Sequence, residues 1–145
     1  MLVLVQRVTS ASVSIGGCVK SSIGSGLLVF VCGQPGDTAE KIEKLAKKVL
    51  KLRIFSDDND RMNLSVQDIQ GELLVVSQFT LAADTHSGNR PGFQGAASPE
   101  EGRRAYEHFL TTLSSLGHPA QTGEFGANMQ VSLTNDGPAT FWLTN

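Results

Sequence analysis

Short β-prone segments separated by glycines open the chain, and they constrain its fold more than any other feature. Residues 2–8 are mostly apolar, "ASVSI" at 11–15 alternates apolar and polar residues, and "LLVFVCG" at 27–33 has the unbroken apolar character of a buried strand. Gly16-Gly17 is a hairpin signal that leads into "CVKSS". The first 33 residues therefore predict three strands in an antiparallel meander.

Residues 37–53 have helical periodicity instead. Asp37 is predicted as the N-cap, with Glu40 three residues on in a capping-box pattern. The apolar side of this helix consists of Ile42, Leu45, Ala46, Val49 and Leu52, with Arg53 next on the same arc. A separate stripe consists of Lys41, Lys44, Lys48 and Lys51. This stripe has two interpretations, a solvated surface or a face that contacts phosphates.

A second helix is predicted from Ser98, which precedes Pro99 and has Glu101 three residues on. Gly117 is its predicted end, and Pro119 supports that end. Its predicted buried stripe consists of Tyr106, Phe109, Leu110, Leu113 and Leu116.

The remaining predicted strands, together with the two helices, indicate the fold class. "GELLVVSQFTL" at 71–81 is predicted as a strand, and two more are predicted at 128–136 and 139–145, joined by a turn at Gly137-Pro138. The irregular segment 82–98 is long for a loop, which is typical of functional loops. The pattern predicts an α+β fold, a mostly antiparallel β-sheet or barrel with two main helices, in a single domain over 1–145.

Composition narrows the function classes. The net charge of −2 over 145 residues gives no global signal for nucleic-acid binding. The start "MLVLVQRV" lacks the features of a signal peptide, and no apolar run approaches the roughly 20 residues of a membrane span, so we expect a cytoplasmic protein without a membrane partner. Cys18 and Cys32 are expected to be buried free thiols, with one disulfide as the alternative.

No cofactor or metal motif stands out. His86, His108 and His118 lack metal-ligand spacing. Of the three only His86, in the long loop, is considered for chemistry, and a solvated loop histidine is its simpler interpretation. "DDND" at 57–60 lacks the spacing of a calcium loop and is interpreted as a solvated turn. We therefore expect neither a metal nor a cofactor.

Two polar strand ends remain. In the first, Ser77, Gln78, Phe79 and Thr80 end an apolar strand, with Ser77 and Phe79 expected on one side and the other two opposite. Thr80 is a potential nucleophile without a neighbouring base. Two other interpretations remain. The segment could supply hydrogen-bond donors to an oxyanion, or it could be a strand end capped by its own hydroxyls.

The second polar stretch is "NDGPAT" at 135–140. Its composition is typical of a turn, and a hairpin connection is the simplest interpretation. A cis Gly137-Pro138 bond is the alternative, because a minority of X-Pro bonds are cis and such a bond redirects two backbone carbonyls. Two fixed carbonyls could act as a rigid steric sieve.

Together, "SQFTLAAD" at 77–84 and "NDGPAT" at 135–140 strongly resemble the D-aminoacyl-tRNA deacylases of the D-tyrosyl-tRNA deacylase type. Segments at 5–15, 26–31, 53–66, 97–100 and 122–133 also match that family in order, so the resemblance covers essentially the whole chain. The departures are small. Ala139 stands where the family commonly has valine, and "RPGF" at 90–93 varies from the usual loop.

The resemblance implies a homodimeric enzyme that hydrolyses the ester between a D-amino acid and the 3′-terminal adenosine of tRNA, with mischarged glycyl-tRNA also accepted. It implies that Ser77, Gln78, Phe79 and Thr80 form the catalytic motif. It further implies a cis Gly137-Pro138 motif that enters the partner's site and rejects L-amino acids by steric clash. Arg7 is expected to hold that motif, and Met129 to join substrate binding and chiral selection.

Two mechanisms stay open. In one, Thr80 attacks and forms an acyl-enzyme; in the other, which we favour for want of a base, water attacks with help from the 2′-hydroxyl of the substrate ribose. Two other function classes also remain. One is a non-catalytic RNA-binding module that uses the lysine stripe, and the other is a general small-ester hydrolase indifferent to tRNA.

Overall fold

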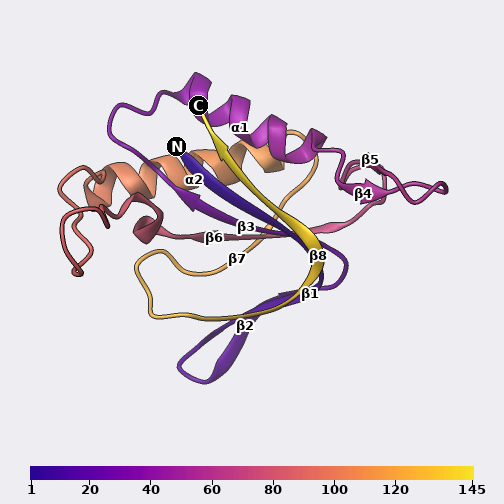
Figure 1. Ribbon diagram of the computed structural model, residues 1–145, viewed down its shortest axis with the longest axis horizontal. Coiled ribbons are helices and arrows are strands. Elements are labelled where there is room, and N and C mark those ends of the chain that lie inside the picture. Colours follow the sequence, from indigo (N-terminus) through magenta and orange to yellow (C-terminus); the bar gives the residue numbers. More distant parts are fainter.

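The computed structural model describes all of residues 1–145, as a curved mixed sheet with two helices packed side by side on one face (Figure 1). The predicted α+β class with two main helices is confirmed. None of the helices combines the length and the apolar character needed to cross a bilayer. Both cysteines are free thiols; Cys32 is buried as predicted, whereas Cys18 is exposed.

The long first strand organises the sheet. β1 (Leu2–Ile15) forms an antiparallel hairpin with β2 (Cys18–Ile23), and the positive φ angles of Gly16 and Gly17 confirm the predicted hairpin turn. β3 (Gly26–Cys32) also pairs antiparallel with β1 and not with β2. The predicted meander is therefore wrong. With 14 residues, β1 is long enough to pair with β3 along its first half and with β2 along its second.

Two crossovers make the sheet mixed. α1 (Ala39–Lys51) connects β3 to β6 (Glu72–Ser77), and α2 (Pro99–Ser115) connects β6 to β7 (Gln121–Thr122). Both connections join parallel neighbours in the order β3-β6-β7, which the prediction of a mostly antiparallel sheet did not include. A small hairpin of β4 (Phe55–Ser56) and β5 (Met62–Leu64) lies between α1 and β6.

The last strand contradicts the predicted turn at Gly137-Pro138. β8 (Gln130–Thr144) is one strand that runs antiparallel to nearly all of β1. Its register jumps from Asn135, opposite Val8, to Thr140, opposite Gln6, so the residues between them bulge out of the ladder. Pro138 fits in a bulge because it has no N–H to donate to the ladder. The chain continues in one direction because β1 offers a partner edge on both sides of the bulge.

The helix ends are partly as predicted. Ser98 and Glu101 form the expected capping box of α2, and Gly117 follows its end with a φ of 84°. At α1, however, Thr38 is the N-cap and its side chain accepts from the N–H of Lys41. The Asp37 carboxylate instead accepts from the N-terminal ammonium and from the N–H of Gln34, both at 2.7 Å.

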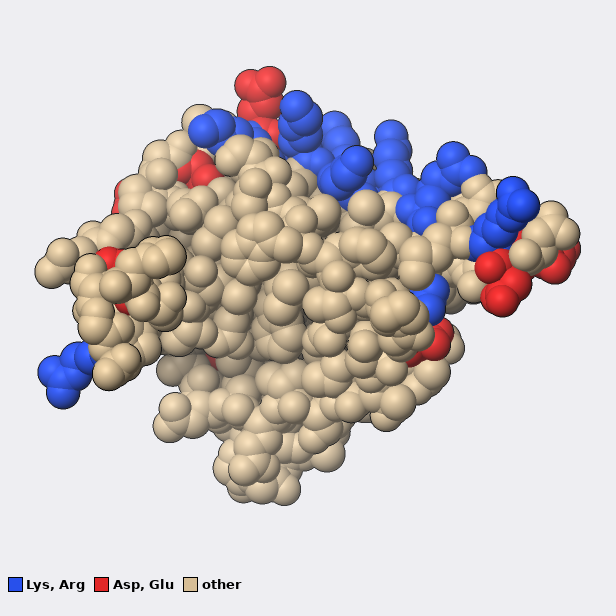
Figure 2. All heavy atoms as spheres, in the orientation of Figure 1, with Lys and Arg blue, Asp and Glu red and all other residues tan.

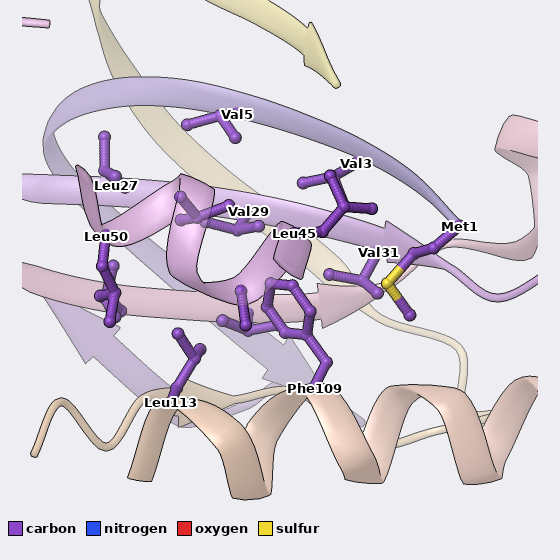
Figure 3. Close-up of a cluster of buried hydrophobic side chains, with 14 of the residues drawn as sticks. Met1, Val3, Val5, Leu27, Val29, Val31, Leu45, Leu50, Phe109 and Leu113 are labelled. Carbon is purple, nitrogen blue, oxygen red and sulfur yellow. The ribbon is translucent and has the colours of Figure 1, made fainter. Parts of the chain in front are cut away.

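The core has two parts because β3 and β6 are buried on both faces. The larger cluster lies between the sheet and the helices, where Phe109 and Leu113 of α2 point toward Val29 and Val31 of β3 (Figure 3). The smaller cluster lies on the other face of the strands. Within the helices, Leu50 is buried where Leu52 was expected, and Leu116 is 39% exposed, contrary to the predicted stripe.

Candidate active site

A cavity of about 460 Å³ opens where β6 ends beside the N-terminus of α2. The ends of β3 and β6, the first turn of α2 and the segment before β8 form its wall. Ser77, Gln78, Phe79 and Met129, all predicted site residues, line it. The fold therefore brings residues more than 50 positions apart in the sequence to one hollow.

The strand predicted over 71–81 ends early, and this shapes the cavity. β6 stops at Ser77, the N–H of Gln78 donates to the carbonyl oxygen of Val31 at 2.8 Å, and a 3₁₀ helix, η1 (Phe79–Ala82), follows. Because the two-residue alternation of a strand is lost here, Gln78 and Phe79 both line the cavity, contrary to the expectation that they point to opposite sides. Phe79 remains 63% exposed.

Phe79 has an aromatic neighbour from the long loop 82–98. Its ring lies 5.1 Å from that of Phe93, centroid to centroid. The loop is irregular, as predicted, and a single pair of backbone hydrogen bonds between Asp84 and Gly92 closes it. Its last residues, Ala96 and Ala97, reach the cavity wall.

Thr80 lies outside this cavity wall. It is exposed, and its hydroxyl accepts a hydrogen bond from the side-chain amide of Gln78. No histidine, lysine or carboxylate hydrogen-bonds to it. Thr80 is thus beside the site, without a group that could take its proton.

The cavity wall contains one ionisable side chain, that of Cys32. Burial raises the pKa of this thiol above its ordinary value. Its Sγ also donates to the carbonyl oxygens of Gly33, at 3.5 Å, and Phe79, at 3.6 Å. Since the thiolate is the reactive form, Cys32 is a poor nucleophile here. The polar groups left in the wall, such as Ser77, Gln78 and Asn128, are neutral.

Tyr106 of α2 helps to fix the strand that carries these residues. Its hydroxyl donates to the carbonyl oxygen of Val75 at 2.9 Å, within the core. Burial raises the pKa of this phenol to about 12. The contact holds α2 against β6 two residues before Ser77.

The Gly137-Pro138 bulge lies elsewhere on the chain. The peptide bond is cis, both residues are exposed, and neither lines the cavity. The buried Arg7 anchors the bulge: its Nε lies 3.1 Å from both the carbonyl oxygen and a carboxylate oxygen of Asp136, and its Nη1 donates to the carbonyl oxygen of Ile54 at 2.6 Å. Arg7 thus contacts Asp136, the residue directly before the Gly137-Pro138 motif.

Asn135 is a residue of this bulge whose role the sequence analysis missed. Its side-chain amide donates to the carbonyl oxygens of Arg7 at 3.0 Å and Ala139 at 3.1 Å, which closes the base of the bulge. Phe125 and Asn128 of the cavity wall were also missed. Only the resemblance over 122–133 pointed to a role for that segment. The strand predicted from residue 128 begins at Gln130, so Asn128 lies in irregular chain, where no periodicity predicts a side chain's direction.

Residues 4–144 match the family described as D-Tyr-tRNA(Tyr) deacylase. The chain belongs to this D-Tyr-tRNA deacylase family. It is 56% identical to a D-aminoacyl-tRNA deacylase of Cupriavidus metallidurans, over 99% of this chain and 95% of that protein. It is 57% identical to a D-aminoacyl-tRNA deacylase of Dinoroseobacter shibae, over 99% of each.

Two solved structures share the fold of this chain. A structure titled "c-Myc DNA Unwinding Element Binding Protein" superposes with a TM-score of 0.94 at 41% identity, over 100% of this chain and 99% of that one. Another, titled "Structural Analysis of a probable eukaryotic D-amino acid tRNA deacylase", has a TM-score of 0.81 at 16% identity, over 98% of this chain and 97% of that one. At that identity the second structure supports the fold alone.

Proposed function

We propose that this chain is an enzyme that hydrolyses the ester of D-aminoacyl-tRNA and releases the free D-amino acid and tRNA. Family membership over residues 4–144 and the relatives named D-aminoacyl-tRNA deacylase support the activity. The single structural observation that carries the mechanism is the cavity beside Ser77, Gln78 and Phe79, which has no basic or acidic side chain except the thiol of Cys32.

A site of this kind suits an ester that needs little activation. Water adds to the ester carbonyl carbon, the bond from that carbon to the ribose oxygen breaks, and the ribose oxygen leaves with a proton. The neighbouring ribose 2′-hydroxyl assists the attacking water, since no side chain of the wall can act as the base. Hydrogen-bond donors around Ser77, Gln78 and Phe79 stabilise the oxyanion, each contributing about 3–4 kcal/mol. Thr80 supports this motif from beside the cavity rather than attacking.

Chiral selection is assigned to Gly137-Pro138 in a homodimer. The motif is exposed and lies outside the cavity of its own chain, while a buried arginine anchors its base, an arrangement suited to entering the cavity of a second copy. There its main-chain atoms, together with Met129, occupy the space that the side chain of an L-amino acid would need. A hydrogen atom on that side of the substrate Cα does fit, so D-aminoacyl and glycyl esters are accepted. We propose that aminoacylated tRNA is the substrate and that the enzyme acts in the cytoplasm.

One assay tests the activity. Purified protein is incubated with D-tyrosyl-tRNA, L-tyrosyl-tRNA and glycyl-tRNA, and release of the amino acid is followed. We expect hydrolysis of the D and glycyl esters and survival of the L ester. Binding without turnover would indicate an RNA-binding module, and equal hydrolysis of all esters, including small ones without tRNA, would indicate a general esterase. Sedimentation of the same sample tests the dimer.

A further inference from the structure

Basic side chains gather along the outer side of α1 (Figure 2). Five lysines of the helix, Arg53 just beyond it and Arg61 between β4 and β5 supply seven of the chain's 12 basic residues, although the net charge is −2. All seven side chains are exposed. They are Lys41, Lys44, Lys47, Lys48, Lys51, Arg53 and Arg61.

None of these seven residues forms an ion pair. Glu43, an acidic residue of α1, contacts His108 of α2 at 3.0 Å and not one of these lysines. Lys48 has lysines four residues before it and three residues after it, an arrangement of like charges that disfavours a helix. The negative end of the helix dipole favours Lys48 and Lys51, but Lys44 lies outside the last turn.

The fold does not require this charge. α1 packs through its opposite side, where Ile42, Leu45 and Val49 are buried in the larger core cluster. From Lys41 to Lys51 the stripe extends about 15 Å along the helix axis, a length over which a nucleic-acid strand presents several phosphates. The positive charge of this face can therefore attract a negatively charged partner.

We propose that this α1 basic face, represented by Lys44, Lys48 and Lys51, binds the phosphate backbone of the tRNA substrate, at the acceptor stem. The inference rests on the proposed function, which supplies a polyanionic substrate. No residue of α1 lines the cavity, so the face contacts the stem and not the acylated adenosine. It consequently acts on capture of the tRNA and leaves the chemical step unchanged.

The test is the triple variant K44Q/K48Q/K51Q, with K44R/K48R/K51R as the charge-retaining control. We expect the glutamine variant to raise KM for D-tyrosyl-tRNA about tenfold or more at moderate salt. We also expect it to lower the slope of log affinity against log salt by about 2 to 3, or about one per phosphate contact. The kcat should stay the same, and so should hydrolysis of 3′-D-tyrosyl-adenosine, which has no stem. The arginine variant should resemble the wild type.

An unchanged KM and salt slope for D-tyrosyl-tRNA in the glutamine variant would overturn this proposal. So would wild-type protein that binds phosphatidylserine vesicles but not tRNA. Equal thermal midpoints for the variants establish that folding is intact, and single substitutions K44Q and K48Q replace the triple if it unfolds. Anisotropy with uncharged tRNA tests the face without turnover. Wild-type protein that binds tRNA but hydrolyses neither D-tyrosyl-tRNA nor 3′-D-tyrosyl-adenosine would therefore refute the proposed function. It would leave the proposed role of the basic face intact.

Discussion

The side chain of Arg7 in β1 holds Asp136 in the bulge of β8. Its Nε lies 3.1 Å from the main-chain carbonyl oxygen of Asp136, while its Nη1 reaches the carbonyl oxygen of Ile54 beyond α1. One buried guanidinium thereby joins three segments that are far apart in the sequence. A planar fork can satisfy two carbonyls in different directions, which a lysine ammonium on a flexible stem does less well.

We expect R7K to lower both stability and activity. Loss of a charged hydrogen bond costs about 1.5–3 kcal/mol of unfolding free energy, measurable by urea denaturation. If the anchored bulge selects the substrate, kcat/KM for D-tyrosyl-tRNA should also fall about tenfold or more, equivalent to about 1.4 kcal/mol. D136N is the matched control, because it removes the carboxylate but keeps the main-chain carbonyl, and it should cost little. Equal losses in both variants would show that the ion pair, not the carbonyl contact, matters.

Thr80→Ala should retain most of the deacylase activity. Thr80 is exposed outside the cavity wall, and its hydroxyl contacts only the Gln78 amide. Single-turnover hydrolysis of D-tyrosyl-tRNA measures the effect on the chemical step. A loss greater than about a thousandfold, or about 4 kcal/mol of barrier, would restore the acyl-enzyme mechanism.

Gly137→Ala should impair deacylation. A Cβ at this position would lie 3.1 Å from Oδ1 of Asn135, the residue that closes the base of the bulge. The Asn135 side chain, which two hydrogen bonds hold in place, would have to give by a few tenths of an ångström. The added methyl group would also change the surface proposed to exclude L side chains. Rates with D- and L-tyrosyl-tRNA are the measurement. Gly95→Ala is the control, since a Cβ there meets nothing within 4 Å. Full activity and unchanged chirality in G137A would remove Gly137 from the sieve.

Tyr106 should make the free energy of unfolding decrease as the pH rises into the alkaline range. Burial raises its pKa from 10.0 to about 12 in the folded state. The unfolded chain therefore loses the phenolic proton first, and the contribution of Tyr106, complete below pH 10, declines between about pH 10 and 12. Urea denaturation across this range measures it.

Tyr106→Phe supplies the comparison. Without the bond to the Val75 carbonyl it should be less stable at neutral pH by about 0.5–1.5 kcal/mol. It should also lose the part of the alkaline decline that the phenol causes. Parallel stability curves for the two proteins between pH 9 and about 12 would contradict the assignment to Tyr106.

Elements with local determinants were predicted from sequence. The Gly16-Gly17 hairpin and the Ser98 capping box each depend on residues within four positions of one another, and both are present. Ser77, Gln78 and Phe79 were candidates from sequence, because polar and aromatic groups at the end of an apolar strand are visible there, and the structure places them on the cavity wall.

Local sequence thus specified both helices, the three strands of the first 33 residues, the caps of α2 and the motif that resembles the family. Contacts between distant segments set three other features: β3 and β6 pair in parallel, β8 passes through Gly137-Pro138 without turning, and Thr80 lies outside the cavity. They also decided that Asp37 binds the chain's own N-terminal ammonium instead of capping α1. The physical reason is the same in each case: the deciding partner is remote in sequence, and local propensity carries no information about it.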